Sequence, residues 1–305
     1  MRALVTGGAG FVGTNLIKRL LKDGYEVTSL DNYSTGKKEN EQEGCVYHKV
    51  NLSETRIEKI KNFTERPDVI FHLAAKARIT PSIENPTETL FNNLNSTIRV
   101  LDYARGYYNS QVNIPVIYAG SSSAHGDLYA NPYTFSKWSG EELCKLYSSV
   151  YGLPTTICRF YNVYGEHQLT EGAYCTVLGI FERLHKQGKA LTVTGDGTQR
   201  RDFTYVGDIV DGLVKCYEYN LITDELTAMR HTDTHQYYEL GHGKNHSILD
   251  LVDAFGETNQ IEYIPERLGE MRETLNTDTK ARDVLGWKPK GDIIEYIKEN
   301  YILDK

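Results

Sequence analysis

Two kinds of segment alternate along the first half of the chain. Short apolar runs there are typical of strands that are buried on both faces of a sheet. These runs cover residues 3–6, 26–30, 68–73, 115–118 and 154–159. Segments with apolar residues at every third or fourth position lie between them and predict helices, at 15–23, 87–106 and 133–151. Strands separated by helices indicate βαβ units, and therefore an α/β fold with a doubly wound parallel sheet.

The alternation is looser beyond residue 165. The pattern there predicts a helix over 172–188, strands over 202–206 and 237–240, and short helices near the end of the chain. We therefore expect two domains. A Rossmann domain covers 1–165 with return segments near 202–245, and a smaller, discontinuous C-terminal domain covers 166–201 and 246–305. The cleft between two such domains is the expected ligand site.

Composition narrows the class of protein. The 305 residues are 40% hydrophobic and 25% charged, as in a globular protein. A net charge of −7 disfavours nucleic acid as a partner, so an anionic ligand would need a local basic pocket. The five scattered cysteines form no C-x-x-C pair, which indicates reduced thiols in the cytoplasm and no metal site. No apolar run approaches the ~20 residues of a membrane span, and we expect neither a signal peptide nor a membrane partner.

A glycine-rich turn follows the first strand and opens the first helix. Gly7, Gly10 and Gly13 have the G-x-x-G-x-x-G spacing, which permits a tight turn and close approach of a pyrophosphate. Asp31 ends the second strand, where a carboxylate accepts hydrogen bonds from the adenosine ribose and repels a 2′-phosphate. A plain glycine turn with a capping aspartate is the alternative, but together the features favour NAD. Asn51 and Leu52, after the third strand, are weaker candidates for contact with adenine.

Three tyrosine–lysine pairs have the i, i+4 spacing that places both side chains on one helix face. Only Tyr133 and Lys137 open a long predicted helix, after Asn131 and Pro132 as a start signal. A nearby ammonium favours phenolate, so Lys137 is expected to lower the pKa of Tyr133 and make it a usable base.

A serine-rich run, 121–123, follows the strand at 115–118 and lies at the expected ligand edge of the sheet. A serine there can hydrogen-bond a substrate hydroxyl close to Tyr133. A polar loop that caps a helix is the alternative. His125, at the end of this run, is expected to be a packing or loop histidine rather than a base.

With these motifs the chain resembles the extended short-chain dehydrogenase/reductase superfamily. Within it, the chain is most similar to NAD-dependent nucleotide-sugar epimerases of the UDP-glucose 4-epimerase type. The resemblance runs over essentially the whole chain. It rests on 6–13, 31–36, 72–75, 82–86, 92–93, 121–126, Tyr133 with Lys137, 159–165, 195–206 and 267–270.

The resemblance implies roles for individual residues. Ser121, Tyr133 and Lys137 are the implied catalytic residues. The resemblance also implies further NAD contacts beside the glycines, Asp31, Asn51 and Leu52. These are Phe11, Val12, Asn32, Ser34, Leu73, Ala74, Ala75, Lys76, Asn93, Tyr133 and Lys137, of which Lys137 would hold the nicotinamide ribose. The implied contacts with the nucleotide sugar are Ser121, Ser122, Asn162, Arg201, Arg267, Glu270 and Thr274. Asn162 and the two arginines would grip the diphosphate of a UDP-sugar, and a homodimer would form through the helices at 87–106 and 133–151.

The implied reaction is epimerisation at C4 through a 4-keto sugar, with Tyr133 as the proton carrier. Thr274 lies where the family gates the sugar pocket, and its small size implies that N-acetylhexosamines enter beside hexoses. Ser122 and Ser123 stand where a dehydratase carries an acid/base pair, which disfavours dehydration. The six-residue stretch 127–132 is shorter than usual and, with Glu166 and His167, leaves the identity of the sugar open. The alternatives are a uronate 4-epimerase, a 3,5-epimerase, a 4-keto reductase and a non-catalytic NAD-binding scaffold.

Overall fold

Seven parallel strands form the central sheet, in the order β10-β6-β5-β4-β1-β2-β3. The strands are β1 (Arg2–Thr6), β2 (Glu26–Asp31), β3 (Cys45–Lys49), β4 (Val69–His72), β5 (Val116–Ser121), β6 (Thr155–Phe160) and β10 (His235–Leu240). The doubly wound α/β fold expected from the sequence is thereby confirmed. The strand order reverses between β1 and β4, and ligands of such sheets bind at this point, beyond the carboxyl ends of the strands.

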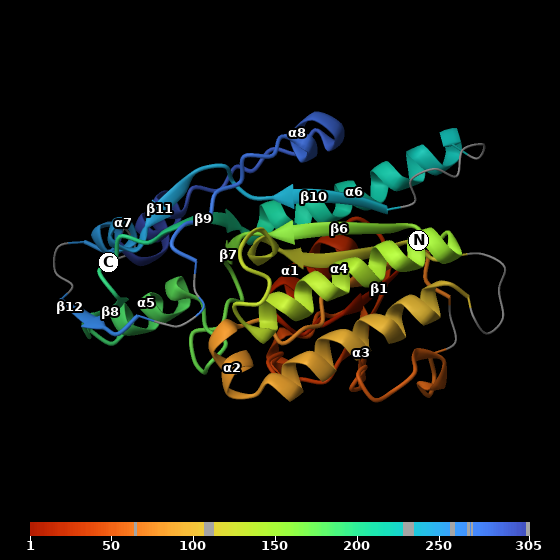
Figure 1. Cartoon of the computed structure of the whole chain (residues 1–305), viewed down its shortest axis with the longest axis horizontal. Coiled ribbons are helices and arrows are strands. Elements are labelled where there is room, and N and C mark those ends of the chain that lie inside the picture. The colour runs from red at the N-terminus through yellow and green to blue at the C-terminus, as the bar shows by residue number, and fades with distance from the viewer. Residues whose placement is uncertain are drawn as a thin grey trace.

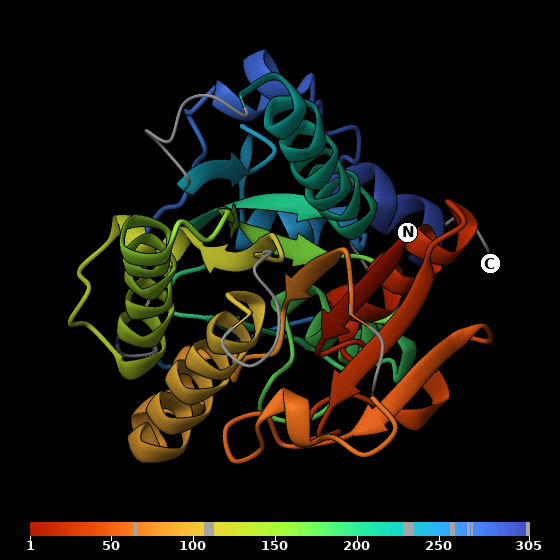
Figure 2. The same ribbon diagram turned by 90° about the vertical axis from the view of Figure 1, so that its right-hand side faces the viewer.

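The computed structural model describes residues 1–63, 66–106, 113–227, 235–256, 260–266, 269 and 271–302, with the backbone alone over 220–227 and at 235. Helices α1 (Phe11–Lys22), α6 (Val206–Thr227) and α8 (Lys280–Leu285) cover one face of the large sheet, and α3 (Pro86–Ala104) and α4 (Pro132–Tyr151) cover the other (Figure 2). In β1, Ala3 and Val5 belong to the core beneath α1 and α6, whereas Leu4 belongs to the core beneath α3 and α4. Both faces of the strand are buried, which explains its continuous apolar sequence.

A smaller unit lies beyond the carboxyl ends of the large sheet, toward which the arrows of β6 and β10 point (Figure 1). One of its sheets has the order β11 (Asn245–Ser247), β9 (Arg200–Tyr205), β7 (Asn162–Tyr164), and the other pairs β12 (Ile261–Ile264) with β8 (Leu191–Thr194). Its helices are α5 (Val177–Lys186), α7 (Ile248–Ala254) and α9 (Ile293–Ile297). Phe181, Phe255 and Ile297 are fully buried in its core.

Short helical segments complete the structure. They are α2 (Ile79–Glu84), the 3₁₀ turns η1 (Lys38–Asn40), η2 (Ile57–Lys59) and η3 (Ser122–His125), and the π turn η4 (Lys298–Ile302). Within the described ranges, no helix has both the length and the apolar character that crossing a membrane requires.

Two expectations about the C-terminal half need correction. From the return segment over 202–245, β10 joins the edge of the large sheet and α6 packs on one of its faces. The strand β9 instead pairs with β7 and β11 in the smaller unit, where Phe203 belongs to that unit's core. The helix expected over 172–188 begins only at Val177. The Thr176 hydroxyl accepts a hydrogen bond from the Gly179 N–H at 3.0 Å and caps α5, and Gly172 has a φ of +87°, which is left-handed backbone.

Candidate active site

The turn between β1 and α1 admits only glycine at two of its positions. Gly7 has a φ of +75°, and a Cβ on Gly13 would lie 2.1 Å from the Gly7 carbonyl oxygen. The backbone can therefore close tightly, and the first residues of α1 line the cavity with their free N–H groups. Such groups form an anion site that suits a pyrophosphate.

Asp31 ends β2 next to this turn and is 7% exposed. Its Oδ2 accepts a hydrogen bond from the Ala9 N–H at 2.9 Å, and its Oδ1 accepts one from the Tyr33 N–H at 2.7 Å. Burial raises the pKa of Asp31, and these two backbone bonds oppose the rise. A carboxylate oriented in this way at the edge of the glycine turn suits a ribose diol, so the cradle fits NAD.

One cavity of about 510 Å³ is lined by every described residue that the sequence assigned to a site. On the cofactor side these are Gly7, Gly10, Phe11, Val12, Gly13, Asp31, Asn32, Ser34, Asn51, Leu52, Leu73, Ala74, Ala75, Lys76 and Asn93. On the other side they are Ser121, Ser122, Tyr133, Lys137, Asn162, Arg201 and Thr274. Arg267 and Glu270 lie outside the described residues. The cavity spans the switch point of the sheet and reaches the smaller unit.

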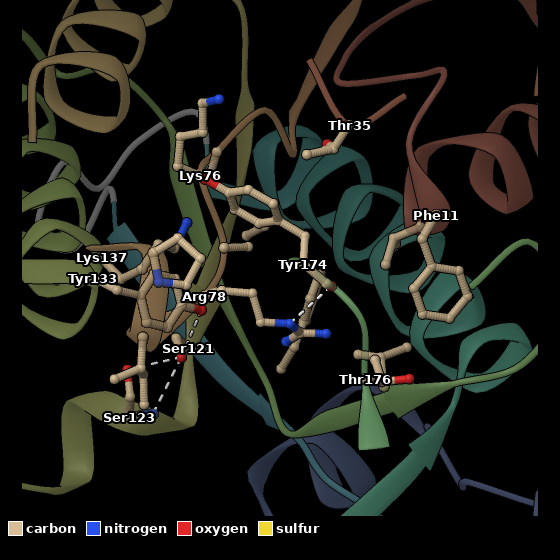
Figure 3. A pocket seen from close by; sticks show the side chains of 18 of the residues that line it. Phe11, Thr35, Lys76, Arg78, Ser121, Ser123, Tyr133, Lys137, Tyr174 and Thr176 are labelled. Carbon is tan, nitrogen blue, oxygen red and sulfur yellow. Dashed lines mark hydrogen bonds between the residues drawn. The ribbon is translucent and has the colours of Figure 1, made fainter. Parts of the chain in front are cut away.

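The Tyr133 hydroxyl donates a hydrogen bond to Ser121 Oγ at 3.3 Å. Ser121 Oγ also lies 2.9 Å from Ser123 Oγ and accepts from the Ser123 N–H at 3.2 Å (Figure 3). The side chain of Ser121, at the end of β5, is therefore fixed by its own loop. This contact places two hydroxyls side by side, so that a proton can pass between Tyr133 and a group bound at Ser121.

Tyr133 is held in place through its backbone. Asn131 accepts a hydrogen bond from the Thr134 N–H at 2.8 Å and caps α4, with Pro132 in the first turn. The Tyr133 N–H donates to Ser82 Oγ at 3.1 Å, which ties the start of α4 to α2. The start signal at Asn131 and Pro132 is therefore a true N-cap of α4, and it determines where the Tyr133 phenol enters the cavity.

The environment of Lys137 is set by Tyr118 on β5 as well as by its own helix. Its Nζ lies 4.3 Å from the centroid of the Tyr118 ring, and burial lowers the pKa of Lys137 to about 8. Burial raises the pKa of Tyr133, while the contact with Ser121 and the charge of Arg78 lower it. The net shift of the Tyr133 pKa is therefore upward, opposite to the lowering expected from the spacing, and the Lys137 ammonium lies over the Tyr118 ring of β5.

Asn93 joins the cofactor side of the cavity to α4. Its Oδ1 accepts from the Lys76 N–H at 2.7 Å, and its Nδ2 donates to Ser136 Oγ at 2.9 Å. The Lys76 ammonium forms an ion pair with Glu88 at 2.9 Å. Asn93 is 3% exposed, so this link between the loop after β4 and α4 is a buried one.

The far end of the cavity is a polar wall from the smaller unit. Thr274 Oγ1 accepts from Asn162 Nδ2 and from the Asp202 N–H, both at 3.2 Å. One Arg201 nitrogen donates to the carbonyl oxygens of Arg200 and Arg272 at 2.9 and 3.1 Å. Thr274 is thus a hydrogen-bonded part of the wall rather than an ordinary strand residue.

Sequence reasoning missed Arg78 and Tyr174, which lie across the middle of the cavity (Figure 3). Arg78 Nε donates to the Tyr174 carbonyl oxygen at 2.9 Å, and the Lys76 ammonium lies 5.6 Å from the centroid of the Tyr174 ring. The sequence did not identify Tyr174 as a site residue because its segment was expected to be helical. Arg78 follows the apolar run of β4 by six residues, and a cation just beyond a strand end at the ligand edge of the sheet was the signal for it.

Comparison with known proteins agrees with this geometry. The profile described as "NAD dependent epimerase/dehydratase family" matches residues 3–223. A putative UDP-glucose 4-epimerase of Methanocaldococcus jannaschii is 31% identical, over 97% of this chain and 95% of its own. UDP-glucuronic acid decarboxylase 1 of Danio rerio is 28% identical, over 94% and 69%.

Among solved structures, the UDP-glucose 4-epimerase of Thermotoga maritima, crystallised with UDP-glucose, has a TM-score of 0.83 at 28% identity, over 98% of this chain and 96% of that one. The profile covers most of the chain, and both the glycine cradle and Asp31 suit NAD. This chain belongs to the NAD-dependent epimerase/dehydratase family.

Proposed function

We propose that this protein epimerises C4 of a nucleotide-activated sugar, a UDP-hexose or UDP-N-acetylhexosamine, through a transient 4-keto sugar. The hydrogen bond between Tyr133 and Ser121, inside one cavity with a dinucleotide cradle, carries this proposal. A phenol paired with a hydroxyl at the ligand edge of the sheet suits proton transfer from a secondary alcohol. Bound NAD supplies the acceptor and donor of hydride at that carbon.

Residues of the chain itself would carry out the proton transfer and bind the cofactor and the diphosphate. Ser121 orients the 4-hydroxyl. Tyr133 takes its proton in the phenolate form and becomes a phenol, and it gives that proton back when the opposite face of the sugar is reduced. Lys137 holds the nicotinamide ribose near Tyr133. Asn162 and Arg201 hold the nucleotide diphosphate, so that the sugar alone can turn over between two poses.

A uronate is the second candidate for the sugar, and Arg78 is the observation that favours it. Its guanidinium projects into the cavity close enough to Tyr133 to lower that residue's pKa (Figure 3). A guanidinium is well suited to a sugar carboxylate. A UDP-uronate would accordingly be either epimerised or, as in the decarboxylase relatives, decarboxylated.

We also propose a homodimer through α3 and α4, which pack against one another on one face of the sheet (Figure 2). Phe91 on α3 and Leu146 and Val150 on α4 are 49%, 51% and 59% exposed. Large apolar side chains exposed on paired helices fit an interface. Sedimentation at micromolar concentration tests this, with Leu146→Glu as the variant expected to give monomers.

One assay separates the activities. The NAD-loaded protein is incubated in separate samples with UDP-glucose, UDP-N-acetylglucosamine and UDP-glucuronate, and proton NMR follows the anomeric signals. New signals of the 4-epimer support the proposal. A pentose product with release of carbon dioxide assigns decarboxylation instead, and no change in any sample contradicts both.

A further inference from the structure

The turn η3 begins directly after Ser121 and ends at His125. Ser121 Oγ caps the start of this turn by accepting a hydrogen bond from the Ser123 N–H at 3.2 Å. Ser121, Ser123 and Gly126 line the cavity of the proposed reaction, whereas His125 faces a second cavity behind them. Any influence of His125 on the reaction therefore passes through the turn rather than through direct contact with the substrate.

The end of the turn is tied to the far edge strand of the large sheet. His125 Nε2 lies 2.9 Å from Oε1 of Glu239 in β10, although 114 residues separate the two. The imidazole is 46% exposed and the carboxylate is 3% exposed. The His125 ring also stacks on the ring of Tyr161, with the centroids 6.5 Å apart. The turn is thus held at its start by Ser121 and at its end by His125.

Glu239 is one member of a buried chain of charges that continues to α4. Its Oε1 also accepts from Arg159 of β6 at 3.0 Å, and Arg159 binds both carboxylate oxygens of Glu141 on α4. A Cβ on Gly120 would lie 2.8 Å from Glu141 Oε1, so the chain packs directly against the end of β5. Four side chains therefore link η3 to the helix that carries the phenol of the catalytic pair.

The charges of this chain balance only when His125 is protonated. Glu141 and Glu239 are buried carboxylates, and Arg159 supplies one positive charge against them. A neutral imidazole leaves one buried negative charge uncompensated, which is costly, and an imidazolium removes the excess. The same cavity is lined by further charged groups from α4 and the C-terminal segment, Lys145, Glu273 and Asp278.

The pKa of His125 follows this balance. The hydrogen bond to Glu239 raises the pKa of His125 above its ordinary value, and the negative charge of Glu141 acts in the same direction. Burial and the charge of Arg159 oppose the rise. The protonated form is the one that the fold favours, and it makes the stronger, charge-assisted hydrogen bond.

We propose that His125 is a positioning residue, which as an imidazolium held by Glu239 anchors the end of η3 and so keeps Ser121 in place beside Tyr133. This inference rests on the proposed function, because the proton transfer that it serves belongs to the proposed reaction. The anchor is complete below the pKa of His125. It weakens as the pH rises through that pKa, since a neutral imidazole offers only an uncharged donor.

His125→Phe is the first variant, because it removes the donor and keeps a ring against Tyr161. Glu239 retains Arg159 and the Tyr161 hydroxyl as hydrogen-bond partners, so the buried carboxylate keeps its donors. We expect kcat to fall about fivefold at pH 6, the scale of one hydrogen bond to a charged group, with KM and NAD affinity within twofold. His48→Phe, on β3 at the opposite edge of the sheet, is the control and should change none of these.

Steady-state kinetics use whichever of UDP-glucose, UDP-N-acetylglucosamine and UDP-glucuronate the wild type converts. The ratio of kcat in the wild type to kcat in His125→Phe isolates the anchor, because the titrations of Tyr133 and Lys137 affect both proteins alike. This ratio should be about five at pH 6 and fall toward two at pH 9. In a Glu239→Gln background it should lie close to one at both pH values, since the charged partner of His125 is gone.

Proton NMR titration of the His125 imidazole, assigned by the signal lost in His125→Phe, gives a readout that does not depend on turnover. The pKa of His125 should lie above the ordinary 6.5 in the wild type and fall in Glu239→Gln. If Glu239→Gln does not fold, the wild-type titration decides, and a pKa at or below 6.5 overturns the proposal.

The kinetic outcomes separate this proposal from the proposed function. A kcat ratio of one in an active wild-type background overturns the positioning role. A ratio that is the same at pH 6 and pH 9, or that persists in Glu239→Gln, overturns the charged anchor. A wild-type protein that converts none of the three UDP-sugars overturns the proposed function, and the role of His125 in it.

Discussion

The hydroxyl of Tyr133 lies 3.3 Å from Oγ of Ser121, although one residue opens α4 and the other closes β5. The connection between them is short and is fixed at both ends, by the turn of Ser121–Ser123 and by the Asn131 cap. The pair is therefore preorganised in the protein without substrate. Proton transfer along this pair needs no rearrangement of the loop.

Tyr133→Phe should lower turnover of UDP-glucose by roughly 10²–10⁴-fold, because only the proton carrier is lost. The ring keeps its packing, so NAD binding should stay within about twofold. Steady-state kinetics and calorimetry measure the two. Tyr129→Phe is the matched control, since Tyr129 is 78% exposed and its loss should change neither. Turnover close to that of the wild type would remove Tyr133 from the mechanism.

Lys137→Met should stabilise the protein at pH 7 while abolishing activity. The folded-state pKa of Lys137 is lowered to about 8 from 10.5. Below pH 8 the lysine is charged in both the folded and the unfolded state. Folding must then bury a charged ammonium, which costs on the order of 3 kcal/mol at most. Between pH 8 and 10.5 the unfolded state binds more protons, so wild-type stability rises with pH and the advantage of the variant shrinks.

Urea unfolding of wild type, Lys137→Met and Lys145→Met at pH 7 and pH 9.5 checks this prediction. Lys145 lies on the same helix in an exposed ion pair with Glu142, so its variant should track the wild type at both pH values. A Lys137→Met protein that is less stable than the wild type at pH 7 would show that the buried ammonium is well compensated.

Asp31→Ala should weaken NAD binding and narrow the preference for NAD over NADP, because the carboxylate that repels a 2′-phosphate is gone. It also leaves the Ala9 and Tyr33 N–H groups without their acceptor, which should cost about 1–3 kcal/mol of folding free energy. Calorimetry on protein stripped of cofactor gives both affinities. Glu26→Ala, at the exposed start of the same strand, is the control. An affinity ratio that does not move would make Asp31 purely a loop residue.

Thr274→Tyr should reduce kcat/KM for UDP-N-acetylglucosamine more than for UDP-glucose, because the ring fills the space between Asn162 and the sugar. The substitution also removes the acceptor for Asn162 and for the Asp202 N–H. Thr274→Val separates the two effects, since it keeps the size and loses the hydroxyl. The ratio of kcat/KM for UDP-N-acetylglucosamine to kcat/KM for UDP-glucose should fall in Thr274→Tyr and stay unchanged in Thr274→Val. An equal fall in both variants would assign the effect to the lost hydrogen bonds.

The sequence predicted the inner strands of the large sheet well because they are buried on both faces, so their apolar runs are visible without knowledge of their neighbours. The edge strand β3 has no fully buried residue and shows no such run. The glycine turn and Asp31 were equally readable, since the backbone at Gly7 and Gly13 excludes other residues. The Asn131–Pro132 start of α4 followed from local capping chemistry. Each of these features is determined by residues that lie only a few positions apart in the sequence.

Contacts between distant segments were decided by the tertiary structure. The i, i+4 spacing put Lys137 on the same face of α4 as Tyr133, but the packing of that helix on β5 brings the ammonium over Tyr118. Arg78 and Tyr174 meet across the cavity from segments 96 residues apart, and Glu239 meets His125 across 114. Local patterns specify elements because hydrogen bonding and burial repeat along the chain. The pKa of a site and the shape of its walls depend on how those elements pack, and no short stretch of sequence carries that information.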